Sequence, residues 1–327
     1  MRQVRQNINI KIFIYFFPLI LISQEFELKE IQLSGLINDK DQEISGMDWY
    51  KNKLFLLPEN QNGFLFVLEK NEIINAINAD DGKIIRPQKT RFIAPDYSEL
   101  IQGFDGFEAI SFKKKNVYIS IEAEHDGVMM GYLIWGKINS RSNEIKIPET
   151  NIKQIETPIQ LKNISFESLL HYKKDVLMMY EANGFNLQPE GASHILFSSK
   201  NKVIKELTCS NVEYRITDVT KLDGKNRFWA INYFWPGDKK LLKPSRDIIL
   251  EKTKEGKTHK ESDVVERLIE FEIKDNNIVF TDKEPMQLEL EKNNPRNWEA
   301  IARLEDKGLL IATDKHPRMI FGFISFK

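Results

Sequence analysis

Five copies of one hairpin pattern constrain the fold more than any other feature of this chain. In Phe107–Glu122 (FEAISFKKKNVYISIE) an apolar strand, a Lys-Lys-Lys-Asn turn and an alternating second strand follow one another, which is the pattern of a β-hairpin. The same unit returns without a gap at Ser45–Glu59, Glu167–Glu181, Asp218–Asn232 and Glu299–Thr313. Five gapless copies indicate a repeat architecture, and spacing of this size points to propeller blades.

The stretches between the hairpins mostly offer two further strands each. These predicted strands are Gly63–Leu68, Thr90–Ala94, Tyr132–Ile138, Ile152–Thr157, Ala192–Phe197, Val203–Leu207, Arg267–Ile273 and Met286–Leu290. A hairpin plus two strands makes a four-stranded sheet, the unit of a β-propeller blade. After the last hairpin only Met319–Phe326 remains, and Phe26–Leu33 supplies the missing strand if the two ends of the chain pair. Such pairing would close the ring and remove a free sheet edge.

We therefore predict an all-β, five-bladed β-propeller closed by pairing of its N- and C-terminal strands. A six-bladed propeller is the alternative within this architecture, but it needs another hairpin that the sequence does not show. A β-sandwich whose strands happen to alternate is the alternative outside it.

The first 23 residues are predicted to be a signal peptide. Arg2, Arg5 and Lys11 precede the apolar run Ile12–Ile22, and Ser23 with Gln24 offers a cleavage point. A retained N-terminal anchor is the alternative, although the run is short for a membrane span. We expect an exported protein, periplasmic or extracellular, with no membrane span after signal removal. Residues 24–327 would form a single propeller domain with an exposed, charged insertion at about 238–266.

Charge and cysteine content exclude some classes of function. The chain has 47 basic and 48 acidic residues, and loss of the three basic residues of the signal segment leaves an excess of acid. Such a chain has no electrostatic reason to bind a nucleic acid polymer. Cys209 is the only cysteine, so no disulfide forms within the chain. We expect a monomer that takes a small molecule at the mouth of its channel.

The residues that open the five hairpins are predicted to form a ring. In an antiparallel hairpin the start of the first strand and the end of the second lie at the same edge, and in a propeller the first strands surround the axis. The opening residues are Ser45, Glu108, Glu167, Asp218 and Glu299. Oxygen ligands that are rich in carboxylates suit Ca²⁺ better than Zn²⁺. The alternative is that these side chains accept backbone hydrogen bonds and tie neighbouring blades together.

A second set of polar residues is expected at the same mouth, at or just beyond the ends of the second strands. It consists of Glu59, Glu122, Glu181, Asn232 and Asp314. His125 and His316 each follow their hairpin opener by seventeen residues, and a histidine there can act as a general base. Our candidate catalytic residues are His125, His316, Glu122 and Glu181. Phe234 and Trp235 directly follow Asn232 and are candidates for an apolar ligand contact at the mouth.

The chain resembles two families. The ring Ser45, Glu108, Glu167, Asp218 and Glu299, together with the first-blade segment KNKLFLLPENQNGFLFVLEKNEI, is similar to the calcium-dependent apyrases, secreted five-bladed nucleotidases in which each blade gives one Ser or Glu to a central Ca²⁺. The segments 107–110 (FEAI) and 298–302 (WEAIA), with Thr313-Asp314, resemble the esterase-like phytase and SdiA-regulated propellers. Both resemblances imply an exported propeller with an acidic, calcium-binding channel. The basic, phosphate-holding residues that apyrases carry after the second strands are replaced here by Glu59-Asn60-Gln61 and Glu181-Ala182-Asn183.

The sequence thus predicts a Ca²⁺-dependent hydrolase of a phosphate ester, a phosphate anhydride or a carboxylic ester. A non-catalytic propeller that binds a ligand or a protein and carries a structural Ca²⁺ is the alternative. A glycan-acting enzyme would need two acids in an open cleft; the ring offers the acids, but the sequence shows no aromatic platform beside them.

Overall fold

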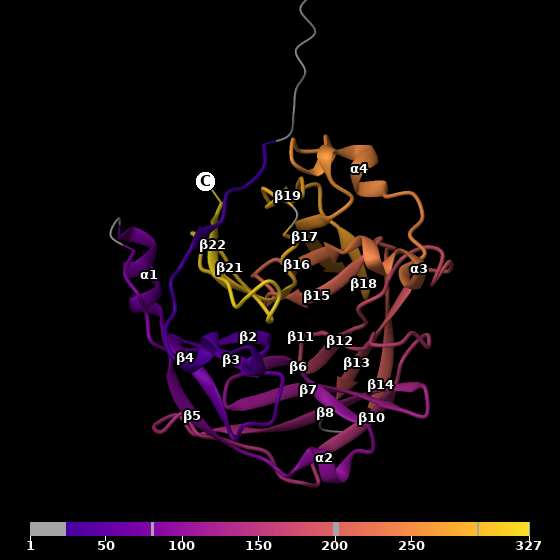
Figure 1. Cartoon of the computed structure of the whole chain (residues 1–327). Helices are drawn as coiled ribbons and strands as arrows, with labels where there is room; N and C mark the ends of the chain where they lie inside the picture. The colour runs from indigo at the N-terminus through magenta and orange to yellow at the C-terminus, as the bar shows by residue number, and fades with distance from the viewer. Residues whose placement is uncertain (1–23, 80–81, 199–202, 293, 327) are drawn as a thin grey trace, which may run out of the picture.

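The computed structural model describes residues 24–79, 82–198, 203–292 and 294–326, so the predicted signal segment 1–23 lies outside the described residues (Figure 1). The structure is mostly β. Its strands form one four-stranded sheet and two nine-stranded sheets. Each nine-stranded sheet contains two four-stranded blades and one additional strand, and the five blades follow one another around a centre in Figure 1.

Each blade contains one predicted hairpin. Blade 1 is β2 (Ile44–Tyr50), β3 (Lys53–Pro58), β4 (Phe64–Glu69) and β5 (Gln88–Ile93), and blade 2 is β6 (Phe104–Lys113), β7 (Asn116–His125), β8 (Val128–Ile138) and β9 (Ile145–Lys146), with β10 (Ile152–Glu156) also pairing with β8. Blade 3 is β11 (Ser168–Tyr172), β12 (Asp175–Met179), β13 (Ala192–Ser198) and β14 (Val203–Cys209). Blade 4 is β15 (Arg215–Val219), β16 (Arg227–Phe234), β17 (Val265–Lys274) and β18 (Asn277–Phe280), with β19 (Met286–Gln287) on β17. Blade 5 is β20 (Trp298–Leu304), β21 (Gly308–Thr313), β22 (Phe321–Ser325) and β1 (Lys29–Glu30).

The ring closes through the two ends of the described chain, as the sequence predicts. Strand β1 pairs antiparallel with β22, so Lys29 lies opposite Phe323 and Glu30 opposite Gly322. The inner strands β2, β6, β11, β15 and β20 contact one another in turn, and β20 returns to β2. The predicted five-bladed architecture, with its N- and C-terminal closure, therefore describes the arrangement of these sheets.

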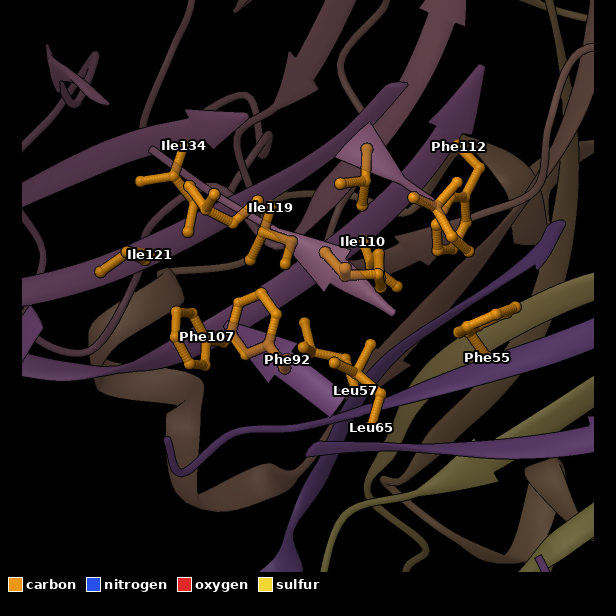
Figure 2. Close-up of a cluster of buried hydrophobic side chains, with 14 of the residues drawn as sticks. Phe55, Leu57, Leu65, Phe92, Phe107, Ile110, Phe112, Ile119, Ile121 and Ile134 are labelled. Carbon is orange, nitrogen blue, oxygen red and sulfur yellow. The ribbon is translucent and has the colours of Figure 1, made fainter. Parts of the chain in front are cut away.

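The hydrophobic core is divided among the five interfaces between blades. Figure 2 shows the cluster between blades 1 and 2, where Phe55 and Leu57 of β3 pack against Phe107 and Ile110 of β6. Four more clusters fill the other interfaces in the same way. Each cluster contains apolar side chains of two neighbouring blades, and burial of this apolar surface holds the blades together.

Short helices cover parts of the outer surface. Helix α1 (Lys70–Asn78) connects β4 to β5 and buries Ile73 and Ala76, while α2 (Tyr97–Leu100) precedes β6 and is capped by Asp96. The 3-10 segments are Leu36–Asn38, Lys40–Gln42, Pro236–Asp238 and His259–Glu261. No helix among the described residues is long and apolar enough to span a membrane.

The segment 238–266 differs from the solvated insertion that we expected. It contains α3 (Lys239–Leu242) and α4 (Ile248–Lys252), and it buries Leu242, Ile249 and His259. The alternating Lys and Glu residues conceal these few apolar positions, which pack on blades 3 and 4. The segment is thus part of the folded domain, although much of its surface is charged.

Candidate acidic site at the channel mouth

Three predicted ring residues come together on the inner strands of blades 2, 3 and 5. Glu108 lies in β6, Glu167 directly precedes β11, and Glu299 lies in β20. The carboxyl groups of Glu108 and Glu167 are joined by a hydrogen bond. Burial raises the pKa of all three carboxyls well above its usual range, and repulsion from neighbouring carboxylates adds to the effect. A hydrogen bond between two carboxyl groups needs a proton on one of them, so the pair Glu108 and Glu167 shares a proton.

β-Bulges lie at or beside two of these three residues, Glu299 and Glu108. The register of β20 against β21 shifts between Trp298 and Ala300, which makes Glu299 the extra residue. The register of β2 shifts in the same way around Ser45, and that of β6 shifts between Phe107 and Ile110, next to Glu108. A bulge leaves one residue outside the ladder and redirects its side chain, and bulges are frequent beside functional sites. A bulge thus recurs in three blades, at or beside the residue that opens the hairpin.

A second row of carboxyls surrounds the first, where the sequence predicts it. Burial, together with the nearby Glu43 and Asp105, raises the pKa of Glu59 to about 8 against the opposing charge of Lys315. Burial, with the charges of Glu181 and Asp105, raises the pKa of Glu122 to about 8. Burial also raises the pKa of Asp314. Several carboxyls at this mouth therefore titrate close to neutral pH.

Arg215 is the cation that the sequence analysis did not identify. Its Nη1 donates a hydrogen bond of 2.9 Å to Glu181 Oε1, and its Nε lies 3.0 Å from Asp238 Oδ2. Burial raises the pKa of Glu181 to about 7 even though the guanidinium opposes the shift. Arg215 lies near the start of an inner strand, at the position that Glu43 holds in blade 1 and Gly106 in blade 2. The only feature of the sequence that could have identified it is a basic residue at that position. Among the carboxyls whose pKa is raised to about 7 or 8, Glu181 ionises most readily, because Arg215 stabilises its charged form.

Gly106 allows Glu59 to enter the site from the neighbouring blade. A Cβ atom at Gly106 would lie 2.5 Å from Cγ of Glu59, which is closer than real contacts allow. Burial leaves Oε2 of Glu122 and Oε2 of Glu181 without a hydrogen-bond partner among the described residues. These two oxygens are available to a ligand, since buried carboxylate oxygens are normally paired.

Ser45 and Asp218 do not extend the carboxylate ring. Ser45 Oγ donates a hydrogen bond of 2.5 Å to the carbonyl oxygen of Phe107 in the next blade. Asp218 accepts hydrogen bonds of 2.8 Å from the backbone of Val219 and of Ile301, and the charged group that raises its pKa besides burial is Asp48. Asp218 is thus one of the ties between blades that we considered as the alternative.

The displacement of Asp218 has a local cause. The backbone N–H of Ile216 donates to the carbonyl of Glu181 as that of Phe107 donates to the carbonyl of Glu59, so a gapless comparison of the five hairpins is one residue out of phase in β15. Thr217 donates a hydrogen bond of 2.5 Å to the carbonyl of Trp298, which matches the bond that Ser45 makes to Phe107. Thr217 is therefore the counterpart of Ser45 in blade 4.

The remaining predicted mouth residues have different surroundings. Asn232 is fully buried, donates to the carbonyls of Glu213 and Arg215, and accepts a bond of 2.7 Å from Arg267. Phe234 is buried against Tyr214, whereas half of Trp235 is exposed. Of these residues, Trp235 alone offers an open apolar face beside the Arg215–Asp238 pair.

The two candidate histidines are both exposed. His125 is the last residue of β7, and its Nε2 lies 3.2 Å from Oδ2 of Asp126. The backbone N–H of His316 donates a hydrogen bond of 2.6 Å to Oδ1 of Asp314, and its ring lies close enough to influence the pKa of that carboxyl. His316 therefore lies at the edge of the acidic mouth, while the described contacts of His125 are with Asp126.

The donor set has the chemistry that Ca²⁺ prefers, because it consists of carboxylate and hydroxyl oxygens. However, no group of three or more His, Cys, Asp or Glu side chains within the described residues is arranged to hold a metal ion. Binding of Ca²⁺ would require carboxyls such as Glu122 and Glu181 to lose their protons and reorient. Ca²⁺ remains a prediction from the sequence.

Comparisons with known proteins supply structural likeness only. No family model and no curated protein matches the chain. Solved structures that resemble it include a mutant α-L-arabinanase of Cellvibrio cellulosa (10% identity, 86% of this chain and 91% of the other, TM-score 0.48) and a GH43 endo-arabinanase of Bacillus licheniformis (9% identity, 89% and 94%, TM-score 0.46). A GH62 α-L-arabinofuranosidase of Coprinopsis cinerea is similar at 7% identity (92% and 98%, TM-score 0.47). The expected membership of the apyrase family is not supported, and none of these likenesses is close enough to assign a reaction.

Proposed function

We propose that the acidic mouth is the active site of a hydrolase that works by proton transfer between carboxyl groups. The observation that carries this proposal is the hydrogen-bonded pair Glu108 and Glu167, placed beside Glu181 with its arginine partner. Two sets of carboxyls whose surroundings push their pKa values apart are the usual mark of an acid and a base in one site. The pair would be the acid, and Glu181 would be the base.

The roles follow from the proton each group holds. The pair Glu108 and Glu167 shares a proton through its hydrogen bond and can donate it to the oxygen of the leaving group. Glu181, with a pKa of about 7 and a guanidinium at 2.9 Å, is partly ionised and can accept a proton from water. The water oxygen then forms the new bond to the substrate as the bond to the leaving oxygen breaks. Both carboxyls return to their starting states by exchange of protons with solvent.

The charge of the mouth favours an uncharged substrate. Acidic side chains gather there from blades 1, 2, 3 and 5, and the two nearby cations, Arg215 and Lys315, are already paired with Glu181 and Glu43. A phosphate group would meet net repulsion in such a site. A glycoside or a carboxylic ester carries no such charge, and hydrolysis of a glycoside in particular uses two carboxyls. The half-exposed Trp235 supplies an apolar surface at the rim of this mouth.

The Ca²⁺-dependent hydrolase of a phosphate ester or anhydride is our second candidate. It is favoured by the unpartnered oxygens Glu122 Oε2 and Glu181 Oε2, which are available as ligands. A bound Ca²⁺ would neutralise the mouth and polarise a phosphoryl oxygen. A non-catalytic propeller with a structural Ca²⁺ is the third possibility. Export from the cell, a monomeric state and the lack of a nucleic acid partner remain predictions from the sequence.

The test is a screen of 4-nitrophenyl glycosides, carboxylic esters and phosphates, each assayed with EDTA and with Ca²⁺. We expect turnover of an uncharged substrate in EDTA and a loss of about 100-fold or more in kcat for Glu167→Gln and for Glu181→Gln. The matched control is Glu156→Gln, an exposed change in β10. Turnover of phosphates alone, and only with Ca²⁺, would favour the second candidate. Full activity of Glu167→Gln would exclude the assigned acid.

A further inference from the structure

Lysines gather in three of the five hairpin turns at the end of the channel opposite the acidic mouth. The hairpin turns of the inner strands lie there, because each hairpin opens at the mouth. Tyr50 pairs with Lys53, Lys113 with Asn116, and Tyr172 with Asp175. Each of these three hairpins therefore turns through two residues, which are Lys51-Asn52, Lys114-Lys115 and Lys173-Lys174. Three neighbouring blades thus present lysine at the same position of the same turn.

These three lysines occupy a backbone conformation that does not suit them. Lys51, Lys114 and Lys173 have φ values of 56°, 55° and 54°. Gly and Asn are the residues favoured at positive φ in a two-residue turn, and other residues are disfavoured there by about 1 kcal/mol. Blade 4 has Asn226 at φ 59° in its own turn. Strained positions that persist often coincide with functional sites, so the repeated choice of lysine calls for an explanation beyond the turn.

Two of these turns border a cavity of about 380 Å³. Its lining includes Lys51, Lys114, Lys115 and Lys221, with aromatic surface from Trp49 and Tyr50. No acidic residue contributes to the lining. The chain as a whole has a net charge of only −1, so four lysines around one cavity are a local concentration of charge.

The four lysines differ in how firmly they are held. Lys221 of blade 4 reaches to blade 1, where its ammonium donates to the carbonyl of Trp49 and lies 3.1 Å from Asp48 Oδ2. The ammonium of Lys51 lies 5.4 Å from the centre of the Tyr50 ring. Within the described residues, Lys51, Lys114 and Lys115 are not part of any ion pair. One lysine is thus fixed and neutralised, and three are free to bind an anion.

We propose that this cavity binds a small molecule that carries two or more phosphate groups. Lysine is a common phosphate ligand because its three N–H donors rotate freely around a point charge. The aromatic walls replace part of the water around the ligand and so strengthen the attraction between charges. This site is independent of the acidic mouth and of the hydrolase proposed there. The uneven charge at the two ends of the channel would also keep such an anion away from the mouth.

The experiment is calorimetric titration of the full-length protein with inorganic tripolyphosphate. We expect binding that weakens as salt rises, since exposed charges are screened. The triple variant Lys51→Gln, Lys114→Gln, Lys115→Gln is expected to weaken binding by about tenfold or more, which corresponds to a few tenths to 1 kcal/mol for each lost charge. The matched control is Lys252→Gln, Lys257→Gln, Lys260→Gln, which removes the same charge from three exposed positions of the segment 238–266.

The control separates a local site from an effect of net charge. Equal weakening in both triple variants would overturn the proposal, and so would the absence of tripolyphosphate binding at an ionic strength of about 0.15 M. A second arm uses vesicles that contain phosphatidylglycerol. Binding to vesicles without binding to tripolyphosphate would replace the small anion by a lipid surface. Because the cavity variants leave the acidic mouth intact, they are also expected to keep the hydrolase activity, whereas Glu167→Gln is expected to keep tripolyphosphate binding.

Discussion

Arg215 of β15 and Glu181, just beyond the end of β12, join two neighbouring blades at the channel mouth through an ion pair with a hydrogen bond of 2.9 Å. Glu181 is almost fully buried, and Arg215 also opposes the rise in pKa that burial and neighbouring carboxylates cause at Glu122 and Glu299. A single guanidinium thus acts on the pKa of acids in three blades.

Replacement of Arg215 by Gln is therefore expected to raise the pKa of Glu181 and to shift the acidic limb of the pH–rate profile upward by at least one unit, on the order of 1.4 kcal/mol. It should also destabilise the fold by about 3 kcal/mol, since the partner is left buried and unpaired. Arg215→Lys is the control, because it keeps the charge. An unchanged acidic limb in Arg215→Gln would show that Glu181 is not the base.

The stability of the protein should fall as the pH rises from 5 to 8. Folding raises the pKa of Glu59 and Glu122 from 4.5 to about 8, and that of Glu181 to about 7. A carboxyl whose pKa is raised in the folded state contributes stability that is complete below its unfolded pKa and is lost as the pH passes its folded pKa. Thermal unfolding in EDTA from pH 5 to pH 8 measures this slope.

Glu122→Gln should flatten that slope and raise the melting temperature at pH 8, because the amide needs no proton. The exposed Glu156→Gln should leave the slope unchanged. A melting temperature that rises toward pH 8 in the wild-type protein would contradict the raised pKa values.

Gly106→Ala is expected to displace Glu59, since its Cβ would lie 2.5 Å from Cγ of that residue. Overpacking of this kind costs about 1–3 kcal/mol, and urea unfolding would measure it. Gly224→Ala is the matched control, because a Cβ there meets no atom within 4 Å and Gly224 lies in a turn of blade 4. Equal effects of the two changes would mean that Glu59 can move aside freely.

Calorimetry in EDTA and in Ca²⁺ tests the metal prediction. Binding to the native state would raise the melting temperature with Ca²⁺ concentration, and Glu167→Gln should reduce that rise. Asp218→Ala should lower stability by about 1–3 kcal/mol, because Ile301 and Val219 lose a hydrogen-bond acceptor, but it should retain the full response to Ca²⁺. If Ca²⁺ has no effect on the wild-type protein, the carboxyls act without this metal.

Local pattern was sufficient to predict the blades. Alternation and polar turns located all five hairpins, and the two ends of the chain pair as expected. The short edge strands were harder to predict. Strand β9 has two residues, and β18 (Asn277–Phe280) pairs in parallel with β14 of the preceding blade. Such strands owe their conformation to a neighbouring sheet, and nothing in their own sequence is long enough to show a period.

The sequence predicted which kind of residues form the acidic site, but it identified only some of these residues correctly. Glu108, Glu167 and Glu299 meet because they share one position of a repeat, which the sequence displays directly. In blade 4 a shift of one residue places Thr217 at that position, and no residue type in the sequence marks such a shift. Arg215 escaped notice for the related reason that its partner Glu181 belongs to another blade.

The closure of the ring has a consequence for how the protein is made. Blade 5 takes β1 from the start of the described chain and β20–β22 from its end, whereas blades 1 to 4 each use one continuous stretch. On a ribosome, the first four blades can fold as they emerge, because domains and their parts form in the order of synthesis. Strand β1 has no partner until β22 has been made. Glu299 of β20 therefore joins the other acids only after blades 1 to 4 have been made, and a chain cut short before β20 would contain four blades but an open, incomplete mouth.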